Sequence, residues 1–322
     1  MDGIIIVDKP AGWTSHDVVA RVRRLLKEKR VGHTGTLDPF ATGVLVLLVG
    51  RATRLAQFLA GAEKEYEATI RLGYSTTTGD LTGARREAAD AGAGTDAGAG
   101  VCAALDRARF EAALAPLRGE IEQVPPMYSA KKVGGRKLYE LARRGEEVER
   151  APARVNVSVF EVLGDEAGAW SRRNEDGTCD VRARVVCSAG TYVRALAESV
   201  GGRLGTGAHL AALRRTRAGE FRVEDAFAPD ELQKLVGAGA EAGRFLLPPE
   251  AALPGLPSAH LTAEEARRVR HGAAVGAGGE ARGWEDGRAV LLLGGGGQLL
   301  AVGVYDAGAG LLRPRVMLAG EK

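Results

Sequence analysis

Residues 44–50, VLVLLVG, form an uninterrupted apolar run, and no other stretch of the sequence limits the possible folds as strongly. A short apolar run beside a glycine is typical of a strand in the middle of a sheet. Residues 4–7, IIIV, lead into a Pro and Gly turn and predict another buried strand. Residues 66–72 alternate apolar and polar side chains, as a strand with one buried face does. The sequence therefore predicts a sheet of buried and half-buried strands.

Helices are expected after two of these strands. The first is predicted to begin at Ser15, which can act as its N-cap, with Asp17 in the first turn. The second spans residues 51–61, with Leu55, Phe58 and Leu59 inward. The first helix and its end also carry a basic group that fits either a solvated face or contacts to phosphate. This group consists of Arg23, Arg24, Lys27, Lys29 and Arg30.

Two stretches look like insertions, and one looks like a linker. Residues 83–104 are rich in Ala and Gly and predict a surface insertion, while residues 166–180 predict a long loop between two strands. The Pro-rich stretch from about residue 247 reads as a linker to a helix, at whose start Thr262 and Glu265 have capping-box spacing, and to three short strands. We therefore expect domains at residues 1–249 and 250–322, the second a small β-barrel-like module.

The composition is that of a folded protein with a slight excess of positive charge. Its 45% hydrophobic and 26% charged residues are ordinary values, and a net charge of +3 permits a polyanionic partner without requiring one. The three cysteines are widely spaced, which indicates neither a disulfide framework nor a metal site, and favours a reducing cytoplasm. No stretch approaches the ~20 apolar residues of a membrane span. A soluble protein is expected.

The segment before the apolar run, GHTGTLDPFATG, places one carboxylate, Asp38, among glycines and threonines. Asp38 fits a turn, a helix cap, a metal ligand or a catalyst. A metal site is disfavoured, because His33 and the other histidines lack the spacing of metal ligands. Phosphate-binding glycine fingerprints and the GxSxG elbow are missing too, so neither a metal nor a cofactor is expected.

Two further segments contain residues suited to chemistry. Residues 124–150 interleave basic residues with Tyr128 and Tyr139 around a Gly134-Gly135 hinge, a pattern that suits either a nucleic acid strand or a solvated hairpin tip. Those we expect to contact an RNA backbone are Lys131, Lys132, Arg136, Lys137 and Arg143. In the second segment, Arg194 follows a strand and a Gly turn where a helix begins. An arginine there can hold a carboxylate with two hydrogen bonds, and an exposed arginine on the helix surface is the alternative.

Taken in order, these motifs resemble the TruB family of tRNA pseudouridine synthases. The resemblance rests on VDKPAGWTSHDVV (7–19), VGHTGTLDPFATGVL (31–45), KEYEATIRLG (64–73), PPMYSAKK (125–132) and CSAGTYVRALAESVG (187–201). It covers residues 1 to about 228 without the two insertions, and the tail is only loosely similar to the family's PUA-like domain. It implies an α+β pseudouridine synthase fold, in which helices flank a mixed, largely antiparallel central sheet.

The family resemblance also implies a reaction and its residues. Such enzymes isomerise the uridine at position 55 in the TψC loop of tRNA, without cofactor or metal. Asp38 would be the essential carboxylate and Arg194 its partner, lowering its pKa, while Tyr66 would stack on the flipped base. Because Tyr66 lies on the apolar face of its strand, a purely structural role in the core is the alternative. Covalent and glycal-type mechanisms both remain open.

Four more residues match family positions in or near the uridine pocket: His33, Tyr192, Leu213 and Lys9. For Lys9 a structural role is equally compatible with the sequence. A guide-RNA-dependent synthase component and a tRNA-binding or folding chaperone are the alternative functions, and the basic 124–150 segment favours a stand-alone enzyme. We expect a cytoplasmic monomer that binds the tRNA T-arm and needs neither a protein partner nor a membrane.

Overall fold

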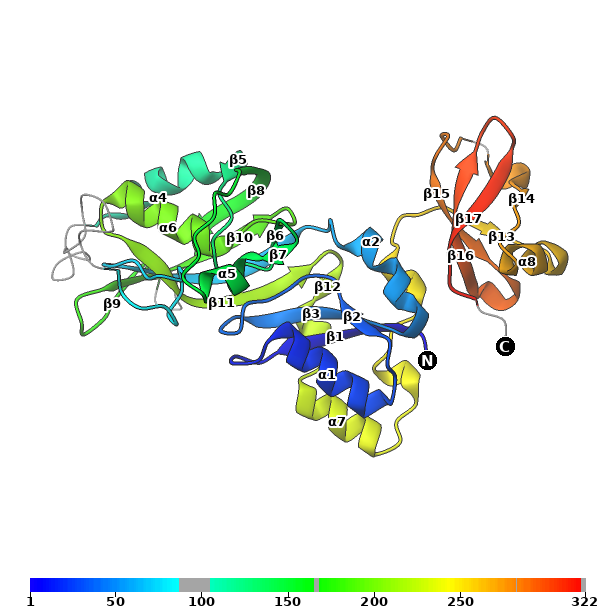
Figure 1. Ribbon diagram of the computed structural model, residues 1–322, viewed down its shortest axis with the longest axis horizontal. Helices are drawn as coiled ribbons and strands as arrows, with labels where there is room; N and C mark the ends of the chain where they lie inside the picture. Colours follow the sequence, from blue (N-terminus) through cyan, green and yellow to red (C-terminus); the bar gives the residue numbers. More distant parts are fainter. Residues whose placement is uncertain (87–104, 165–167, 282, 320–322) are drawn as a thin grey trace.

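The computed structural model describes residues 1–86, 105–164, 168–281 and 283–319. Its centre is a ten-stranded sheet, and a separate five-stranded sheet follows it in the chain (Figure 1). The main path of the large sheet runs β1 (Gly3–Lys9), β3 (Thr42–Val49), β11 (Ala208–Ala218), β4 (Lys64–Leu72), β10 (Cys179–Cys187), β8 (Ala153–Val162) and β5 (Gly119–Gln123). The short strands β2 (Val31–His33), β9 (Arg172–Arg173) and β12 (Phe221–Arg222) pair beside this path.

Only the contact between β11 and β3 is parallel along this path, so the predicted mixed, largely antiparallel sheet is confirmed. The two strands approach closely at Gly43, where an added Cβ would lie 2.2 Å from the Arg215 carbonyl oxygen. Glycine is therefore required where the strand that follows Asp38 meets β11.

The apolar run in β3 is buried on both faces. One face packs with helices α1 (Ser15–Leu26) and α7 (Pro229–Gly237), and the other with the 3₁₀ helix η1 (Gly50–Leu55) and part of the C-terminal module. Figure 1 shows α1 and α7 together beside β1 and β3. The prediction of a central strand is confirmed, and the run is apolar throughout because neither face meets water.

The other half of the sheet is buried on one face only. Helices α4 (Arg107–Leu114) and α6 (Val193–Leu204) cover the face to which Tyr66, Ala68 and Ile70 point. The alternate residues Glu65 and Glu67 point to the opposite face and pair with arginines of β10 and β11. The alternation predicted for β4 is confirmed.

Strand β11 contains two irregularities that decide where its side chains point. Between Arg215 and Arg217 the register with β4 shifts, because Thr216 is an extra residue without a partner across the strands. As a result Arg215 lies opposite Tyr66, while Arg217 lies opposite Glu65. A β-bulge of this kind changes the face to which the following side chains point.

Both predicted N-terminal helices form, with corrections at their ends. The N-cap of α1 is Thr14, not Ser15: Thr14 and Asp17 form a capping box, whereas the Ser15 hydroxyl bonds the backbone of Leu37. The predicted second helix is split into η1 and the short helix α2 (Ala56–Leu59). Of the residues expected to face inward, Leu55 and Leu59 are buried and Phe58 is half-buried.

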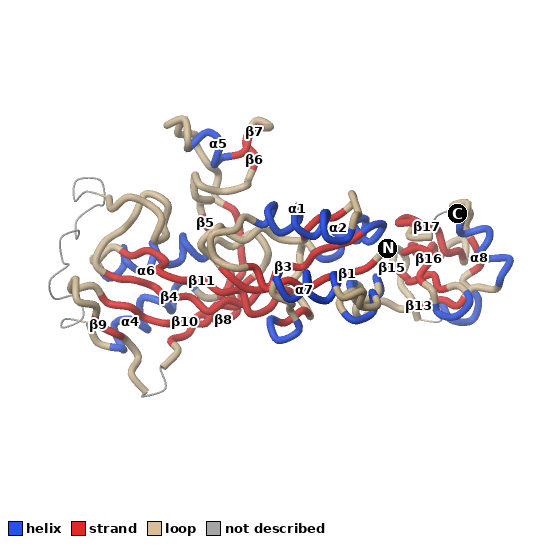
Figure 2. The backbone as a smooth tube through the Cα atoms, turned by 90° about the horizontal axis from the view of Figure 1, so that it is seen from below, coloured by secondary structure: helices blue, strands red, loops and turns tan. Residues whose placement is uncertain are grey.

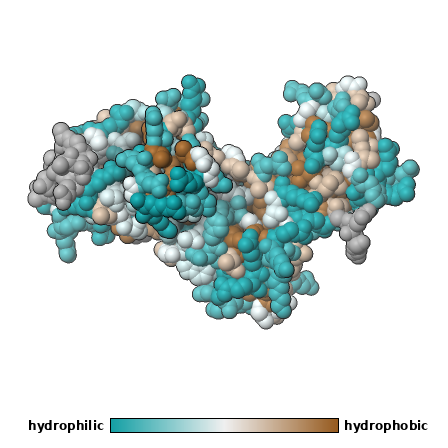
Figure 3. All heavy atoms as spheres, in the orientation of Figure 1, coloured by the Kyte–Doolittle hydropathy of each residue, from teal (hydrophilic) through white to brown (hydrophobic). Residues whose placement is uncertain are grey.

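The basic segment 124–150 projects from the body (Figure 2). It forms a hairpin of β6 (Lys132–Val133) and β7 (Arg136–Lys137), with Gly134 and Gly135 between them, and the helix α5 (Leu138–Ala142). We call residues 124–150 the thumb. Hydrophilic side chains cover much of its surface in Figure 3.

The C-terminal module is a curled sheet with one α-helix among its described residues. Its strands run in the order β13 (Ser258–His260), β15 (Ala289–Leu293), β16 (Leu299–Asp306), β17 (Leu311–Met317) and β14 (Val275–Gly276). The helix α8 (Ala263–Arg270) has the predicted capping box of Thr262 and Glu265. A β-barrel-like, PUA-type module was expected, and this sheet agrees with that expectation.

The Pro-rich stretch before this module is not a solvated linker. It contains the short 3₁₀ helix η6 (Pro249–Ala252), and Ala252 and Leu253 are buried in a core shared with β1, β3 and β16. The Glu250 carboxylate also accepts a hydrogen bond from the backbone N–H of Leu299 (3.0 Å). The boundary at residue 250 stays a prediction.

Most of the Ala and Gly rich insertion, residues 87–104, and residues 166 and 167 of the second insertion lie outside the described residues. The rest of the second insertion is not all loop, because β9 and the first two residues of β10 fall within it. The expectation of no disulfide was wrong for Cys179, which is disulfide-bonded, while Cys187 is a buried free thiol. Within the described ranges, no helix has the length and apolar character needed to cross a membrane.

Candidate active site

The loop that presents Asp38 is tied to the N-terminal segment at several points. The Ser15 hydroxyl accepts from the Leu37 N–H (2.9 Å) and donates to the Leu37 carbonyl (3.2 Å). The Pro39 carbonyl accepts from the Gly12 N–H (2.8 Å) and from the Lys9 ammonium (3.2 Å). Residues on both sides of Asp38 are therefore fixed, so the carboxylate has a defined direction.

Asp38 is held by Arg194 at the start of α6, as predicted. The Arg194 Nε and Nη2 atoms donate to Asp38 Oδ2 (2.9 Å) and Oδ1 (3.1 Å). The same guanidinium donates to the carbonyls of Thr78 and Tyr128, each at 2.8 Å. Its side chain is 4% exposed, whereas that of Asp38 is 33% exposed. The arginine is thus a fixed support, and the carboxylate remains accessible.

A second carboxylate, Asp80, lies near the same Nε atom of Arg194. Its Oδ2 atom is 4.0 Å from Arg194 Nε. Its Oδ1 atom accepts from the hydroxyls of Thr78 (2.8 Å) and Thr82 (2.5 Å). Arg194 therefore has two carboxylates near it, and Asp38 is the one that forms two short hydrogen bonds to it.

Arg194 lowers the Asp38 pKa, as predicted, but the net shift of this pKa is upward, which the prediction missed. Burial is the largest influence and raises the pKa of the Asp38 carboxyl above its usual value, and the charge of Asp80 adds to this rise. The Arg194 charge and its hydrogen bonds lower the pKa but do not cancel the effect of burial. Arg194 therefore counteracts the cost of placing a carboxylate here.

A cavity of about 260 Å³ opens beside Asp38 and collects most of the predicted residues. Asp38, Tyr66, Tyr192, Arg194 and Leu213 all line it. Tyr66 satisfies both of its predicted alternatives, since it is 8% exposed in the sheet core and also lines this wall. Burial raises the pKa of its phenol, which makes Tyr66 a poor base at neutral pH.

Lys9 and His33 do not line this cavity. The Lys9 ammonium donates to the carbonyls of Pro10 (3.0 Å), Trp13 (2.7 Å) and Pro39 (3.2 Å), which favours the structural role. His33 is half-buried at the end of β2 and contacts the His16 ring edge-on, with ring centroids 5.6 Å apart. Burial lowers the His33 pKa to about 4, so its imidazole is neutral at pH 7.

The predicted RNA-backbone cations lie on the thumb. Lys131, Lys132, Arg136 and Arg143 are exposed, and Lys137 is half-buried. The Lys137 ammonium and the Arg143 guanidinium lie 5.4 Å and 5.5 Å from the Tyr139 ring centroid. In the basic group of the first helix, Arg23 donates to the Val31 carbonyl (2.7 Å) and so has a structural role. A solvated face or contacts to phosphate remain the two alternatives for the other four basic residues of that group.

Three charged residues of this region were not predicted: Lys64, Arg215 and Asp80. The first two line the Asp38 cavity. Lys64 is two residues before Tyr66, and Arg215 is two residues after Leu213. Residues two apart in a strand point to the same face, so the alternation would have placed both cations on the cavity face. Asp80 sits in TTTGDLTG, a lone carboxylate among Gly and Thr like Asp38.

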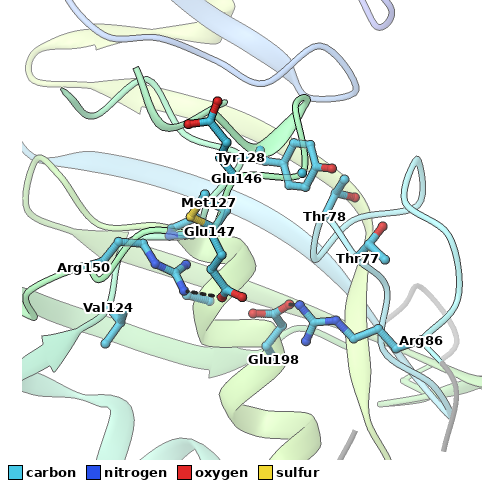
Figure 4. A pocket seen from close by; sticks show the side chains of 14 residues that line it. Thr77, Thr78, Arg86, Val124, Met127, Tyr128, Glu146, Glu147, Arg150 and Glu198 are labelled. Carbon is cyan, nitrogen blue, oxygen red and sulfur yellow. Dashed lines mark hydrogen bonds and ion pairs between the residues drawn. The ribbon is translucent and has the colours of Figure 1, made fainter. Parts of the chain in front are cut away.

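A larger cavity, of about 480 Å³, lies on the far side of Thr78 and Tyr128, between the base of the thumb and α6. Figure 4 shows Glu147 facing Arg150, and Glu198 facing Arg86. These pairs are 3.4 Å and 3.9 Å apart. We take the smaller cavity as the candidate active site, because Asp38, Tyr66 and Arg194 line it and do not line the larger one.

In the described part of the chain, no three His, Cys, Asp or Glu side chains gather as a metal site would require. One carboxylate beside an aromatic ring can supply acid, base or nucleophilic chemistry.

Comparisons with known proteins show what this chain is similar to. Proteins named tRNA pseudouridine synthase B from Thermobifida fusca and Geobacillus kaustophilus are 51% and 45% identical to this chain. The alignments cover 84% and 85% of this chain, and 85% and 90% of those proteins. An H/ACA ribonucleoprotein structure with a substrate RNA containing 2'-deoxyuridine is 25% identical with a TM-score of 0.67, covering 98% of this chain and 85% of that one.

Two family models divide the chain near α6. One, a tRNA pseudouridylate synthase B C-terminal domain, matches residues 194–254. The other, the N-terminal domain of TruB family pseudouridylate synthases, matches residues 23–193, which include Asp38 and Tyr66. Together with the relatives, these matches show that the chain belongs to the TruB family of pseudouridylate synthases.

Proposed function

We propose that this protein isomerises uridine to pseudouridine at position 55 in the TψC loop of tRNA, with Asp38 as the essential carboxylate. The observation that carries the proposal is the pair of hydrogen bonds from buried Arg194 to Asp38, on the wall of a cavity that Tyr66 also lines. The curated relatives named tRNA pseudouridine synthase B supply the substrate class.

The reaction breaks the N1–C1′ bond of uridine, turns the uracil and joins C5 to C1′. A carboxylate can capture or stabilise the electron-poor sugar carbon, as it does in glycosidases. Asp38 suits this role because Arg194 aims it and leaves a third of its side chain exposed to a ligand. Tyr66 would stack on the turning base, which is worth ~1 to 3 kcal/mol.

The target base must leave its stack before it can reach Asp38, at a cost of a few kcal/mol. The thumb is placed to contribute, since it carries exposed cations and connects directly to the site through the Tyr128 carbonyl on Arg194. His33, next to cavity residue Thr34, could fill the vacated stack as a neutral ring. We expect the protein to bind the T-arm as a monomer in the cytoplasm.

A guide-dependent role is the second candidate, because the solved neighbours include H/ACA ribonucleoprotein components, among them an archaeal Nop10–Cbf5 complex. The two candidates differ in what RNA they need. A stand-alone enzyme converts an isolated T-arm hairpin, whereas a guide-dependent component converts none without its guide.

The test is tritium release from a tRNA transcript that carries 5-tritiated uridine, in the presence of EDTA. We expect release by the wild type, with the product at position 55, and a loss of about 10³-fold or more for Asp38→Asn. Asp225→Asn, at an exposed aspartate, is the matched control and should retain full activity. Equal rates for Asp38→Asn and wild type would refute the role of Asp38.

A further inference from the structure

The candidate active site contains two buried cations that the proposed chemistry does not use. Lys64 is 8% exposed and Arg215 is 2% exposed, and both line the Asp38 cavity. Within the described residues neither forms an ion pair with a carboxylate, although Arg194 in the same wall does. Buried charges are normally paired, so the missing partner needs an explanation.

The backbone uses only part of the hydrogen-bonding capacity of these two side chains. Arg215 donates from Nε to the Val44 carbonyl (2.6 Å) and from Nη2 to the Gly35 carbonyl (3.0 Å), and it also bonds the Tyr66 hydroxyl. Lys64 donates to the carbonyls of Ala60 (3.1 Å) and Ala62 (2.5 Å). A guanidinium and an ammonium each have further N–H donors.

Lys9 is a buried lysine whose hydrogen-bonding capacity is fully satisfied by the backbone. Its ammonium has a carbonyl partner for each of its N–H groups, at Pro10, Trp13 and Pro39, and it lies outside the cavity. Lys64 has one partner fewer and lies in the cavity wall.

The two cations converge beneath Gly35 of the Asp38 loop. A Cβ atom built on Gly35 would lie 3.6 Å from Arg215 Nη1 and 3.8 Å from Lys64 Cε. The absence of a side chain at this position leaves the approach to both cations open. The positive charge therefore faces the cavity in which Asp38 lies.

We infer that Lys64 and Arg215 form an anion subsite that binds a phosphodiester of the RNA strand entering the active site. A backbone phosphate supplies the negative charge and acceptor oxygens that the protein does not provide. The assignment rests on the proposed RNA substrate. Its consequence is that the phosphate, and not only the base, would position the target nucleotide against Asp38.

The first test combines a substitution with a neutral RNA linkage. Binding of a T-arm hairpin is measured for the wild type, Lys64→Met and Lys64→Arg, with single methylphosphonates replacing each phosphodiester near the target uridine. We expect Lys64→Met to weaken binding about 10-fold and to lower the salt slope by about 0.7. At one linkage the methylphosphonate should weaken the wild type but not Lys64→Met, while Lys64→Arg retains that sensitivity.

The second test supplies the missing carboxylate from the protein. Gly35→Asp would place an acid within reach of both cations, and Gly35 has an ordinary backbone conformation that a side chain can adopt. We expect this variant to melt at a higher temperature than the wild type and to bind the hairpin more weakly. Lys234→Met, at an exposed lysine of α7, is the control and should change neither property.

Two results would overturn the assignment. One is additivity: at every linkage, the methylphosphonate would weaken hairpin binding by the same factor in Lys64→Met as in the wild type. The other is stabilisation of the wild type, but not Lys64→Met, by inorganic phosphate alone without any linkage-specific coupling, which would assign the site to a free anion. Linkage-specific coupling without pseudouridine formation would keep the subsite and refute only the proposed activity.

Discussion

The two faces of strand β4 differ in how their positive charges are paired. On the solvent face, Glu65 accepts from Arg184 (2.9 Å) and Arg217 (3.3 Å), and Glu67 accepts from Arg182 (3.1 Å). The alternate residues Lys64 and Tyr66 point to the cavity face and lie beside Arg215 of β11. Among the described residues, no carboxylate forms an ion pair with Lys64 or with Arg215. The arginines beside β4 on the solvent face are thus paired with carboxylates, whereas the two cations on the cavity face are not.

This difference separates charges that hold the sheet from charges that await a ligand. Cross-strand ion pairs on a solvated face contribute little each, because water already stabilises both partners. A buried cation without a carboxylate is costly unless something else compensates it. Arg194 is the intermediate case, since its carboxylate partner is also the group proposed to react.

The largest expected effect comes from removing the charge that supports Asp38. Arg194→Met leaves the Asp38 carboxylate without its two short hydrogen bonds and should lower the free energy of unfolding by about 3 kcal/mol. Pseudouridine formation should fall to background. Arg182→Met on the solvent face, where that arginine is 50% exposed, should cost only about 0.5 kcal/mol. Urea denaturation of both variants makes the comparison, and equal losses would contradict it.

A smaller loss is expected at Lys9, the buried cation that the backbone satisfies completely. Lys9→Met leaves the carbonyls of Pro10, Trp13 and Pro39 without a donor and should cost about 2 kcal/mol of unfolding free energy. Activity should fall with it, because Pro39 adjoins Asp38. If denaturation shows no change while substrate binding weakens, Lys9 belongs to the substrate site and not to the scaffold.

The smallest effects are expected in acid, where the two faces should respond with opposite sign. Arg184 holds the Glu65 pKa below its usual value, so this residue adds stability above about pH 4.3 that is lost as the pH falls. Burial raises the Asp38 pKa, so the folded state keeps its proton longer and stability declines as the pH rises from about 3.9.

Unfolding free energies of the wild type, Glu65→Gln and Asp38→Asn between about pH 3 and pH 7 check this pair of signs. The advantage of the wild type over Glu65→Gln should grow with pH, and its advantage over Asp38→Asn should shrink. Parallel curves for the two variants would show that the two carboxylates do not differ as described.

The sequence predicts the strands of this protein better than it predicts the electrostatics. The apolar run of β3 and the alternation of β4 follow from local periodicity, and the Asp38–Arg194 pair follows from the family resemblance. The Asp38 pKa shift could not be predicted, because burial depends on elements distant in sequence. The Thr14 cap was missed because Ser15, an equally good capping residue, follows it directly and is used to hold Leu37.

The bulge at Thr216 has a consequence for how this chain can change. If β11 kept Thr216 but paired regularly, a period of two would place Thr216 opposite Glu65 and turn Arg217 towards the cavity, away from Glu63 and Glu65. The sorting of charges between the two faces therefore depends on the bulge, because Arg215 and Arg217 would share one face of a regular strand that retains Thr216. Deleting Thr216 would remove the bulge and keep Arg215 opposite Tyr66 and Arg217 opposite Glu65, whereas a regular strand that retains Thr216 would move Arg217 from the scaffold to the site.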